Sequence, residues 1–223
     1  MSSFLALARR SLPDLLAGTA ITVELTAICI ASGFLIGLLV ALGRVYGRKP
    51  IYLIATAYVE FIRGTPLLVQ LFIIYYGLPD VGIVLQPILA AGIAFGINTA
   101  AYQAEYFRGA IQSIGIGQMM AARALGLTKM QAIRRVILPQ ALRTVIPAWS
   151  NELIYMLKYT SLAFVVGVPE IVARANMIAS RTFRYFELYV LAALIYLVLV
   201  GMATWGLGWL ERRVAIPGLE MRR

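Results

Sequence analysis

The chain of 223 residues contains no histidine and a single cysteine, Cys29. Without histidine it lacks the commonest metal ligand, the commonest general base and the side chain whose charge usually changes near neutral pH. One cysteine inside an apolar run supplies neither a disulfide framework nor a metal-ligand spacing, so we interpret Cys29 as a packing residue. The sequence therefore disfavours hydrolytic and metal chemistry and predicts no metal site.

Charged residues are also scarce. They make up 13% of the chain, against about 25% in a typical soluble domain, and hydrophobic residues make up 61%. This composition predicts an integral membrane protein. The formal net charge of +10 would suggest a nucleic-acid partner in a soluble protein. Because the cations fall mainly between apolar runs, we expect them to set membrane topology and expect no nucleic acid to bind.

Long apolar runs predict the fold class. A transmembrane helix needs about 20 predominantly apolar residues, and five runs of that length give an all-α integral membrane fold with one transmembrane domain over residues 1–223. The apolar run after Asp14 is too long for a cleavable signal, so we expect it to remain as an anchor. The expected spans are 18–42, 51–78, 87–111, 144–168 and 188–210.

The second expected span carries a helix breaker. Pro66 lacks a backbone donor, so we expect this helix to break or kink near Thr65. Glu60 and Arg63 lie three residues apart on one helical face, and we expect them to pair with each other at the cytoplasmic surface.

The distribution of cations predicts the orientation. When alternate connections are assigned to opposite faces of the membrane, most cations fall on one face, which the positive-inside rule makes cytoplasmic. The N-terminus is then expected outside and the C-terminus in the cytoplasm. The cytoplasmic group comprises Arg44, Arg48, Lys49, Arg108, Arg123, Lys129, Arg134, Arg135, Arg143, Arg212, Arg213, Arg222 and Arg223.

The connection 113–140, between the third and fourth expected spans, contains the cationic stretch "GQMMAARALGLTKMQAIRRVILPQ". Strong helix formers predict a short helix that ends at Gly126 in a left-handed conformation. Thr128 and Gln131 match a capping box, which predicts a second short helix that runs to Pro139. A solvated loop that only sets topology and a docking element for a partner both fit this local pattern.

The spacing of this stretch resembles the EAA loop of bacterial ABC importer permeases: Glu-Ala-Ala, three residues, Gly, nine residues, Ile-x-Leu-Pro. The segments "FIRGTPLLVQLFIIYYGLP" (61–79) and "NELIYMLKYTSLAFVVGVPEI" (151–171) are similar to permeases of the polar amino acid uptake family, so the resemblance covers most of the chain. The matching loop positions are Ala121, Ala122, Gly126, Leu138 and Pro139, while Met120 and Val136 replace the motif's glutamate and isoleucine.

The resemblance implies that the connection 113–140 is a cytoplasmic coupling helix that inserts into an ATPase and transmits its closure to the spans. It further implies a bacterial inner membrane, two ATPase subunits, a second permease subunit that is identical or different, and an extracytoplasmic solute-binding protein. The sequence has no G-x-x-x-x-G-K-[ST] motif, so this chain is expected to be no enzyme and to bind no cofactor, with ATP and Mg bound by the partner ATPase. The implied coupling residues are Met120, Ala121, Ala122, Arg123 and Gly126.

Polar residues within the expected spans predict a substrate site. Ionisable groups near the centre of a membrane helix cost about 2.5–3.5 kcal/mol each, so they usually face a cavity or a partner. A carboxylate, a lysine, amides and phenols together suit an amino acid. The alternative is that Glu152 and Lys158 pair with each other or with other helices as structural glue. At 100° per residue, the candidates share one stripe on each of two spans: Asn98 and Tyr102 on the third, and Asn151, Glu152, Tyr155 and Lys158 on the fourth.

Residues 169–187 predict an amphipathic helix on the outer face. Its cations Arg174, Arg181 and Arg184 suit either an acidic surface of the solute-binding protein or lipid headgroups. Glu24 is expected at the membrane interface, and Glu105 is expected to pair with Arg108.

These observations predict a membrane-spanning subunit of an ATP-driven importer of polar or charged amino acids, which couples ATPase closure to alternating access. The alternative is a stand-alone ion-coupled secondary carrier or channel, which would need no ATPase.

Overall fold

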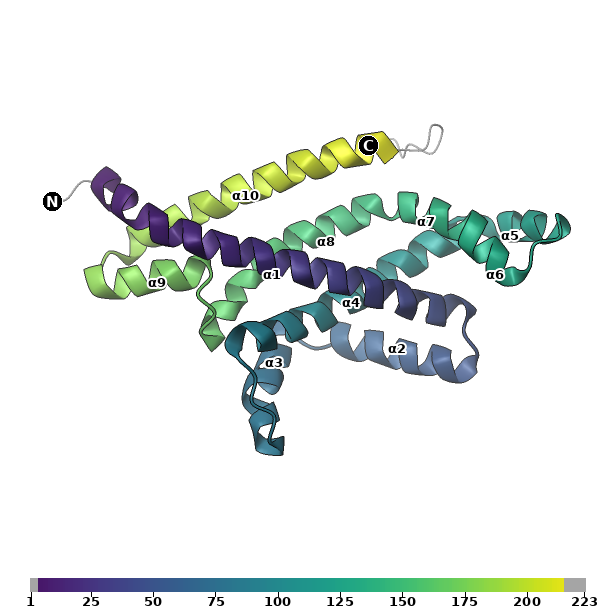
Figure 1. Cartoon of the computed structure of the whole chain (residues 1–223), viewed down its shortest axis with the longest axis horizontal. Helices are drawn as coiled ribbons and strands as arrows, with labels where there is room; N and C mark the ends of the chain where they lie inside the picture. The colour runs from purple at the N-terminus through teal and green to yellow at the C-terminus, as the bar shows by residue number, and fades with distance from the viewer. Residues whose placement is uncertain (1–3, 215–223) are drawn as a thin grey trace.

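The structure, a computed structural model, describes residues 4–214, and all the regular elements in that range are helices. The helix α1 (Phe4–Tyr46) has 43 residues and is about 64 Å long at 1.5 Å per residue, so it runs along most of the long axis of the molecule, and α5 and α6 extend beyond its end (Figure 1). The helix α10 (Tyr185–Val214) has 30 residues and contains the expected span 188–210. Arg222 and Arg223, assigned above to the cytoplasmic face, lie outside the described residues.

The second expected span is not one straight segment. It divides into two helical parts bent by 103° to each other, so the break expected near Thr65 is confirmed. Pro66 lies in an extended conformation at the start of the second part, as its ring requires. The parts are α2 (Lys49–Arg63), then α3 (Leu67–Phe72) with the π-helical turn η1 (Ile73–Gly77) and the 3₁₀ turn η2 (Leu78–Val81).

The helix α4 (Pro87–Ser113) crosses the middle of the bundle and packs closely on α1. Small residues make this approach possible. A Cβ atom on Gly37 of α1 would lie 2.8 Å from the carbonyl oxygen of Ala100 on α4, and seven alanines of α4 are among its buried residues. Two membrane helices pack this closely only when side chains between their backbones are small.

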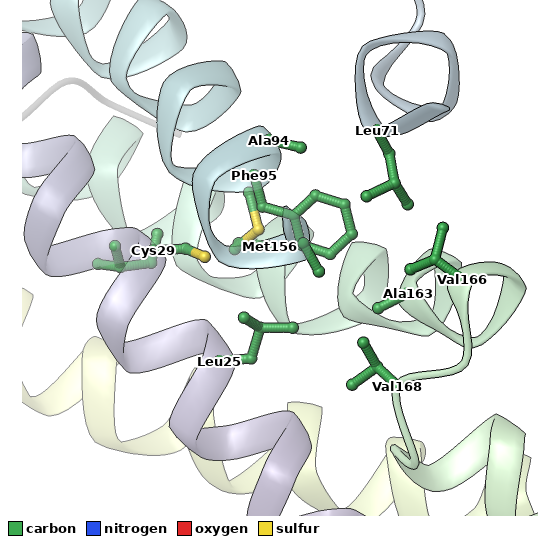
Figure 2. Packing of buried hydrophobic residues seen from close by; sticks show 11 residues of the cluster. Leu25, Cys29, Leu71, Ala94, Phe95, Met156, Ala163, Val166 and Val168 are labelled. Carbon is green, nitrogen blue, oxygen red and sulfur yellow. The ribbon is translucent and has the colours of Figure 1, made fainter. Parts of the chain in front are cut away.

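An apolar core joins α1, α3 and α4 to the second half of the chain (Figure 2). Phe95 of α4 lies at its centre beside Met156, and both side chains are fully buried. Cys29 is also fully buried in this core, which confirms its interpretation as a packing residue.

The connection 113–140 forms a helix, a tight turn and further helical segments. Gly126 has φ of +84° and follows the first helix, and Thr128 and Gln131 form both bonds of a capping box, so these predictions are confirmed. The expected end at Pro139 is wrong, because Pro139 lies in the first turn of another helix, where its missing N–H has no helical partner to lose. The segments are α5 (Gly115–Ala124), α6 (Lys129–Ala132), the π-helical turn η3 (Ile133–Ile137) and α7 (Leu138–Thr144).

The fourth expected span is built from α8 (Ile146–Tyr159) and the 3₁₀ segment η4 (Thr160–Val166). Gly167, with φ of +90°, turns the chain into α9 (Ile171–Thr182), which is bent by 47° from the segment before it. The predicted amphipathic helix is confirmed, because Ile171, Ala175 and Ala179 bury one face of α9.

Candidate functional site

A cavity of about 600 Å³ lies where the break between α2 and α3 faces α4 and α8. Its wall combines charged, amide and phenolic groups with apolar side chains. The lining residues are Arg63, Gly64, Thr65, Pro66, Leu67, Leu68, Asn98, Tyr102, Tyr106, Glu152, Tyr155, Tyr159 and Leu162.

Glu152 of α8 places a carboxylate in this wall, and the residue is only 5% exposed. Its Oε1 accepts a hydrogen bond of 2.7 Å from the Thr99 hydroxyl, and its Oε2 accepts one of 3.3 Å from the Tyr106 hydroxyl. An ionised carboxylate has about four acceptor positions, so these two neutral donors leave room for a cation. The arrangement suits an ammonium or guanidinium group of a ligand.

Arg63, the last residue of α2, places a guanidinium group in the same cavity. The group lies 5.2 Å from the centroid of the Tyr102 ring, which orients it by a cation–π contact. Its nearest carboxylate oxygen, on Glu105, is 3.8 Å away. The guanidinium can therefore form further hydrogen bonds to an anionic ligand group.

Glu105 is the centre of an ion-pair cluster beside the cavity. Its carboxylate pairs with Arg44 of α1 and Arg108 of α4 as well as with Arg63, so the expected Glu105–Arg108 pair is confirmed. The expected Glu60–Arg63 pair is wrong. Arg63 pairs with Glu105 of α4, whose carboxylate is less exposed than that of Glu60. The Oε1 of Glu60 lies 4.0 Å from a guanidinium nitrogen of Arg44.

The break that shapes the cavity is held by Gln70 of α3. Its amide Nε2 donates to the carbonyl oxygen of Ile62 over 2.7 Å and to the Thr65 hydroxyl over 2.8 Å, on the other side of the break. Its Oε1 accepts a bond of 3.0 Å from the Asn98 amide of α4. Asn98 therefore lines the cavity and also fixes the broken helix against α4.

The structure brings four of the six predicted substrate residues to the cavity: Asn98, Tyr102, Glu152 and Tyr155. Asn151 and Lys158 are exposed on α8 and do not line it. Lys158 lies over the Tyr155 ring, with Nζ 4.8 Å from the centroid. No ion pair joins Glu152 to Lys158 in the described part of the chain. Glu152 does bond to another helix, through Thr99 and Tyr106 of α4, as the structural-glue alternative also allowed.

Two side chains of the cavity, Arg63 and Tyr106, were not predicted as substrate residues from the sequence. Arg63 was assigned to a surface pair because Glu60 is its neighbour in sequence, whereas its real partners come from α4. Tyr106 could have been found, because it follows Tyr102 by four residues and so shares its helical stripe with Asn98.

The proposed coupling residues lie on or near α5. Met120 is 61% exposed, and Ala121, Arg123 and Gly126 are exposed as well. Ala122 differs: it is 4% exposed, so its small side chain packs within the chain. Its role in coupling stays a prediction.

The three cations of the outer segment differ in their surroundings. Arg181 is exposed on α9. Arg174 is half-buried, with Nε 3.4 Å from the carbonyl oxygen of Pro169, and Arg184 pairs with Glu187 over 3.0 Å. Arg181 thus presents its charge to the surroundings most directly.

Residues 4–214 contain no group of three or more Cys, Asp or Glu side chains placed to hold a metal ion.

The chain is similar to known transport proteins in both sequence and structure. Residues 33–216 match the model of a family described as the binding-protein-dependent transport system inner membrane component. The probable glutamine ABC transporter permease protein GlnM of Bacillus subtilis is 40% identical over 193 residues, covering 86% of this chain and 89% of that protein. The glutamine transport system permease protein GlnP of Escherichia coli K12 is 38% identical over 208 residues, covering 92% and 95%.

A solved structure is similar as well. The chain from the crystal structure of an amino acid ABC transporter with histidines superposes with a TM-score of 0.89 and is 41% identical, and the match covers 96% of this chain and 99% of that chain.

Proposed function

Because the chain belongs to the family of inner membrane components of binding-protein-dependent transport systems and is an amino-acid ABC transporter permease subunit, we propose that its cavity carries a polar or charged amino acid across the membrane. The chain is the permease component and not the ATPase. It is a multi-pass inner membrane protein. We further propose the class of its substrate, its partner subunits and its topology in the membrane.

The presence of Glu152 and Arg63 in one cavity carries the proposal. An amino acid has a carboxylate and at least one ammonium group, and these two side chains offer a partner for each. We assign the substrate carboxylate to Arg63, in the place that sequence reasoning gave to Lys158, and a substrate cation to Glu152. Asn98, Tyr102 and Tyr155 supply amide and phenolic groups that orient the ligand. Two relatives are named for glutamine and one solved structure for histidines, which supports a polar amino acid.

The proposed membrane arrangement has five spans in a single permease domain over residues 1–223. Two of the described helices are long and apolar enough to cross a membrane, and four spans result when each bent pair counts as one. The fifth is α4, whose 27 residues are long enough and whose polar side chains, such as Gln103, are buried among other helices rather than facing lipid. The excess of cations in the connections supports an N-terminus outside and a C-terminus in the cytoplasm.

The connection 113–140 is proposed as the coupling element for two ATPase subunits, which bind ATP and Mg. Exposed Met120, Leu125 and Met130 support this role, since they are 61%, 82% and 70% exposed and form a surface that an aqueous loop would not favour. Ala121, Arg123 and Gly126 lie on the same connection. Closure of the ATPases on this element would move α4 and α8, which it joins, and so alternate the access to the cavity.

The outer helix α9 is proposed to dock the solute-binding protein. Its exposed Arg181, with Arg174 and Arg184 nearby, suits an acidic surface on that partner. A second permease subunit completes the complex.

Reconstitution tests the proposal. The chain is assembled with its ATPase in proteoliposomes that contain ATP and Mg, the solute-binding protein is added outside, and uptake of labelled glutamine, arginine, glutamate and leucine is measured. The expected result is uptake of at least one polar amino acid that needs ATP and the binding protein and persists after ion gradients are dissipated. Uptake of leucine alone would overturn the substrate assignment.

A further inference from the structure

Three cations gather at the turn that joins α1 to α2. Arg48 lies in this turn and Lys49 begins α2, and both are exposed. The exposed Lys129, the first residue of α6, places its Nζ 5.5 Å from the centroid of the Tyr46 ring at the end of α1. The turn therefore lies beside the start of α6, at the same end of the molecule as α5 and α6 (Figure 1). We name Arg48, Lys49 and Lys129 the turn cluster.

No carboxylate compensates the turn cluster within residues 4–214. None of the ion pairs in that range includes any of its three cations. The sequence has no acidic residue between Glu24 and Glu60, or between Glu105 and Glu152. Arg44, about one turn earlier on α1, differs because its guanidinium pairs with Glu105. Like charges without a counter-charge repel each other, so a bound anion would stabilise this end of the molecule.

The turn cluster lies at the edge of a surface that suits lipid tails. The exposed aliphatic side chains of α2 begin directly after Lys49, with Ile51, Leu53 and Ile54. The end of α1 reaches the same level, because a Cβ atom on Gly43 would lie 3.2 Å from the Ile51 side chain. Cations at the edge of a lipid-facing surface lie at the depth of the phospholipid headgroups.

We propose that the turn cluster binds the phosphate group of an anionic phospholipid, such as phosphatidylglycerol, in the cytoplasmic leaflet. The inference rests on the proposed topology, which puts this end of the molecule on the cytoplasmic side, and it adds a ligand that the proposed function does not include. Basic clusters beside membrane helices attract anionic headgroups. Arginine offers a planar fork of N–H donors to phosphate oxygens, and each lysine ammonium offers three donors.

The neighbouring aliphatic surface favours a lipid over a soluble protein partner. An acyl chain that covers Ile51 and Ile54 carries its phosphate to the adjacent cations, so one molecule satisfies both the apolar surface and the charges. An acidic protein surface would neutralise the cations but would leave those side chains without a partner inside the membrane.

A lipid phosphate at this place joins two parts of the chain. Arg48 belongs to the connection between the first two spans, whereas Lys129 belongs to the proposed coupling element. A phosphate between them holds α6 against the end of α1 and so strengthens the attachment of the coupling element to the spans. We therefore expect ATP-driven uptake to depend on anionic lipid.

Lipid binding by the purified complex tests the inference. The complex of this chain with its ATPase is titrated in detergent with phosphatidylglycerol or with phosphatidylcholine, and native mass spectrometry counts the lipids that it retains. Lys129→Gln, Arg48→Gln and Lys49→Gln each remove one charge of the turn cluster. Arg213→Gln is the matched control, because exposed Arg213 on α10 also lies over an aromatic ring, 4.2 Å from the centroid of Trp209.

The expected result is retention of phosphatidylglycerol in preference to phosphatidylcholine, with an affinity that falls about fivefold or more in each cluster variant. Arg213→Gln should leave the affinity nearly unchanged. All four side chains are exposed, so the substitutions should leave the fold intact. An equal loss of affinity in Arg213→Gln would show only a general attraction between a cationic protein and anionic lipid, and would overturn the inference. Equal retention of the two lipids by the wild type would overturn it as well.

Two further measurements separate a lipid from other anionic partners. Soluble glycerol phosphate should not displace the lipid, because it has no acyl chain to cover the aliphatic surface of α2. Displacement at concentrations comparable with that of the lipid would assign the turn cluster to a free phosphate and overturn the inference. Co-purification of the ATPase should be unchanged in Lys129→Gln, and its loss with unchanged lipid binding would show that the cluster faces the ATPase instead.

Uptake in proteoliposomes separates this inference from the proposed function. Wild-type uptake should rise with the fraction of phosphatidylglycerol in the membrane, and Lys129→Gln should need a larger fraction. Uptake of a polar amino acid by a complex that shows no preference for phosphatidylglycerol would refute the lipid site and leave the function standing. Preferential binding by a complex that takes up no polar amino acid would support the lipid site and refute the function.

Discussion

The hydroxyl of Thr99 on α4 donates a hydrogen bond of 2.7 Å to Oε1 of Glu152 on α8, and both residues are buried. Thr99 in turn accepts a bond of 3.1 Å from the Gln103 amide, whose oxygen accepts one of 3.0 Å from the indole N–H of Trp149. This chain of bonds fixes the carboxylate in the cavity wall. Among the described residues, its second oxygen accepts one bond, of 3.3 Å, from a tyrosine hydroxyl, which leaves acceptor capacity for a ligand.

Glu152→Gln removes the negative charge and keeps the shape of the side chain. If the carboxylate binds a substrate cation, the kcat/KM of uptake should fall about 10- to 100-fold, because a hydrogen bond to a charged group contributes about 1.5–3 kcal/mol. Assembly should be unchanged. The measurements are initial uptake rates in proteoliposomes and co-purification of the ATPase; unchanged kinetics would argue against a binding role, and loss of assembly would favour a structural one.

Arg63→Gln tests the assignment of the substrate carboxylate. Arg63 and Arg108 both pair with Glu105, but only Arg63 lines the cavity, so Arg108→Gln is the matched control. We expect Arg63→Gln to raise the KM of uptake about tenfold or more, through loss of a charge-assisted hydrogen bond, and Arg108→Gln to leave it nearly unchanged. Equal effects of the two substitutions would show that only the ion-pair cluster matters.

Gly126→Trp tests the coupling element. No atom lies within 4 Å of the Cβ position at Gly126, so the tryptophan itself fits the chain, and the left-handed backbone adds strain of about 1–2 kcal/mol. Gly126→Ala carries a similar strain without the bulk. We expect the tryptophan variant to insert normally but to lose co-purification of the ATPase and uptake, while the alanine variant retains both. Full association of the tryptophan variant would contradict the coupling assignment.

Gln70→Leu tests the bonds that hold the broken second span. It removes the hydrogen bonds to Ile62, Thr65 and Asn98 and should destabilise the protein by about 2–3 kcal/mol. That loss corresponds to a fall of about 5–10 °C in the midpoint of thermal unfolding. Gln140→Leu, which removes one bond of 2.8 Å to Val136, is the control and should have a much smaller effect. Unfolding is followed by circular dichroism in detergent, and equal midpoints for the two variants would refute the role of Gln70.

Arg181→Glu distinguishes a docking surface on α9 from a lipid contact. If the exposed cation meets an acidic surface of the solute-binding protein, the charge reversal should raise severalfold the concentration of binding protein needed for half-maximal ATPase stimulation. The wild-type interaction should weaken at high salt. Arg184→Gln, at a cation already paired with Glu187, serves as the comparison. Unchanged stimulation by Arg181→Glu would favour lipid headgroups.

Local features were predictable because their causes lie within a few residues. A proline in a helix interior breaks or kinks the helix, as Pro66 does in the second span. Gly126 adopts the left-handed conformation that follows α5. The side chains of Thr128 and Gln131 each accept a hydrogen bond from the other's backbone N–H. The buried and exposed faces of α9 follow from the period of the helix alone. The spacing of residues in the connection 113–140, together with the segments 61–79 and 151–171, indicated the family.

Only the tertiary structure decided which polar groups share a site. The chain bends by 103° near Thr65, and Arg63 at the end of α2 contacts Tyr102 and Glu105 of α4. Its sequence neighbour Glu60 lies instead near Arg44. Helical periodicity placed Glu152 and Lys158 on one stripe, but a stripe about 120° wide spans both a cavity and an exposed rim. Which part of the stripe faces the cavity depends on the orientation of α8 about its own axis relative to α4. That orientation is set by contacts between helices far apart in the sequence.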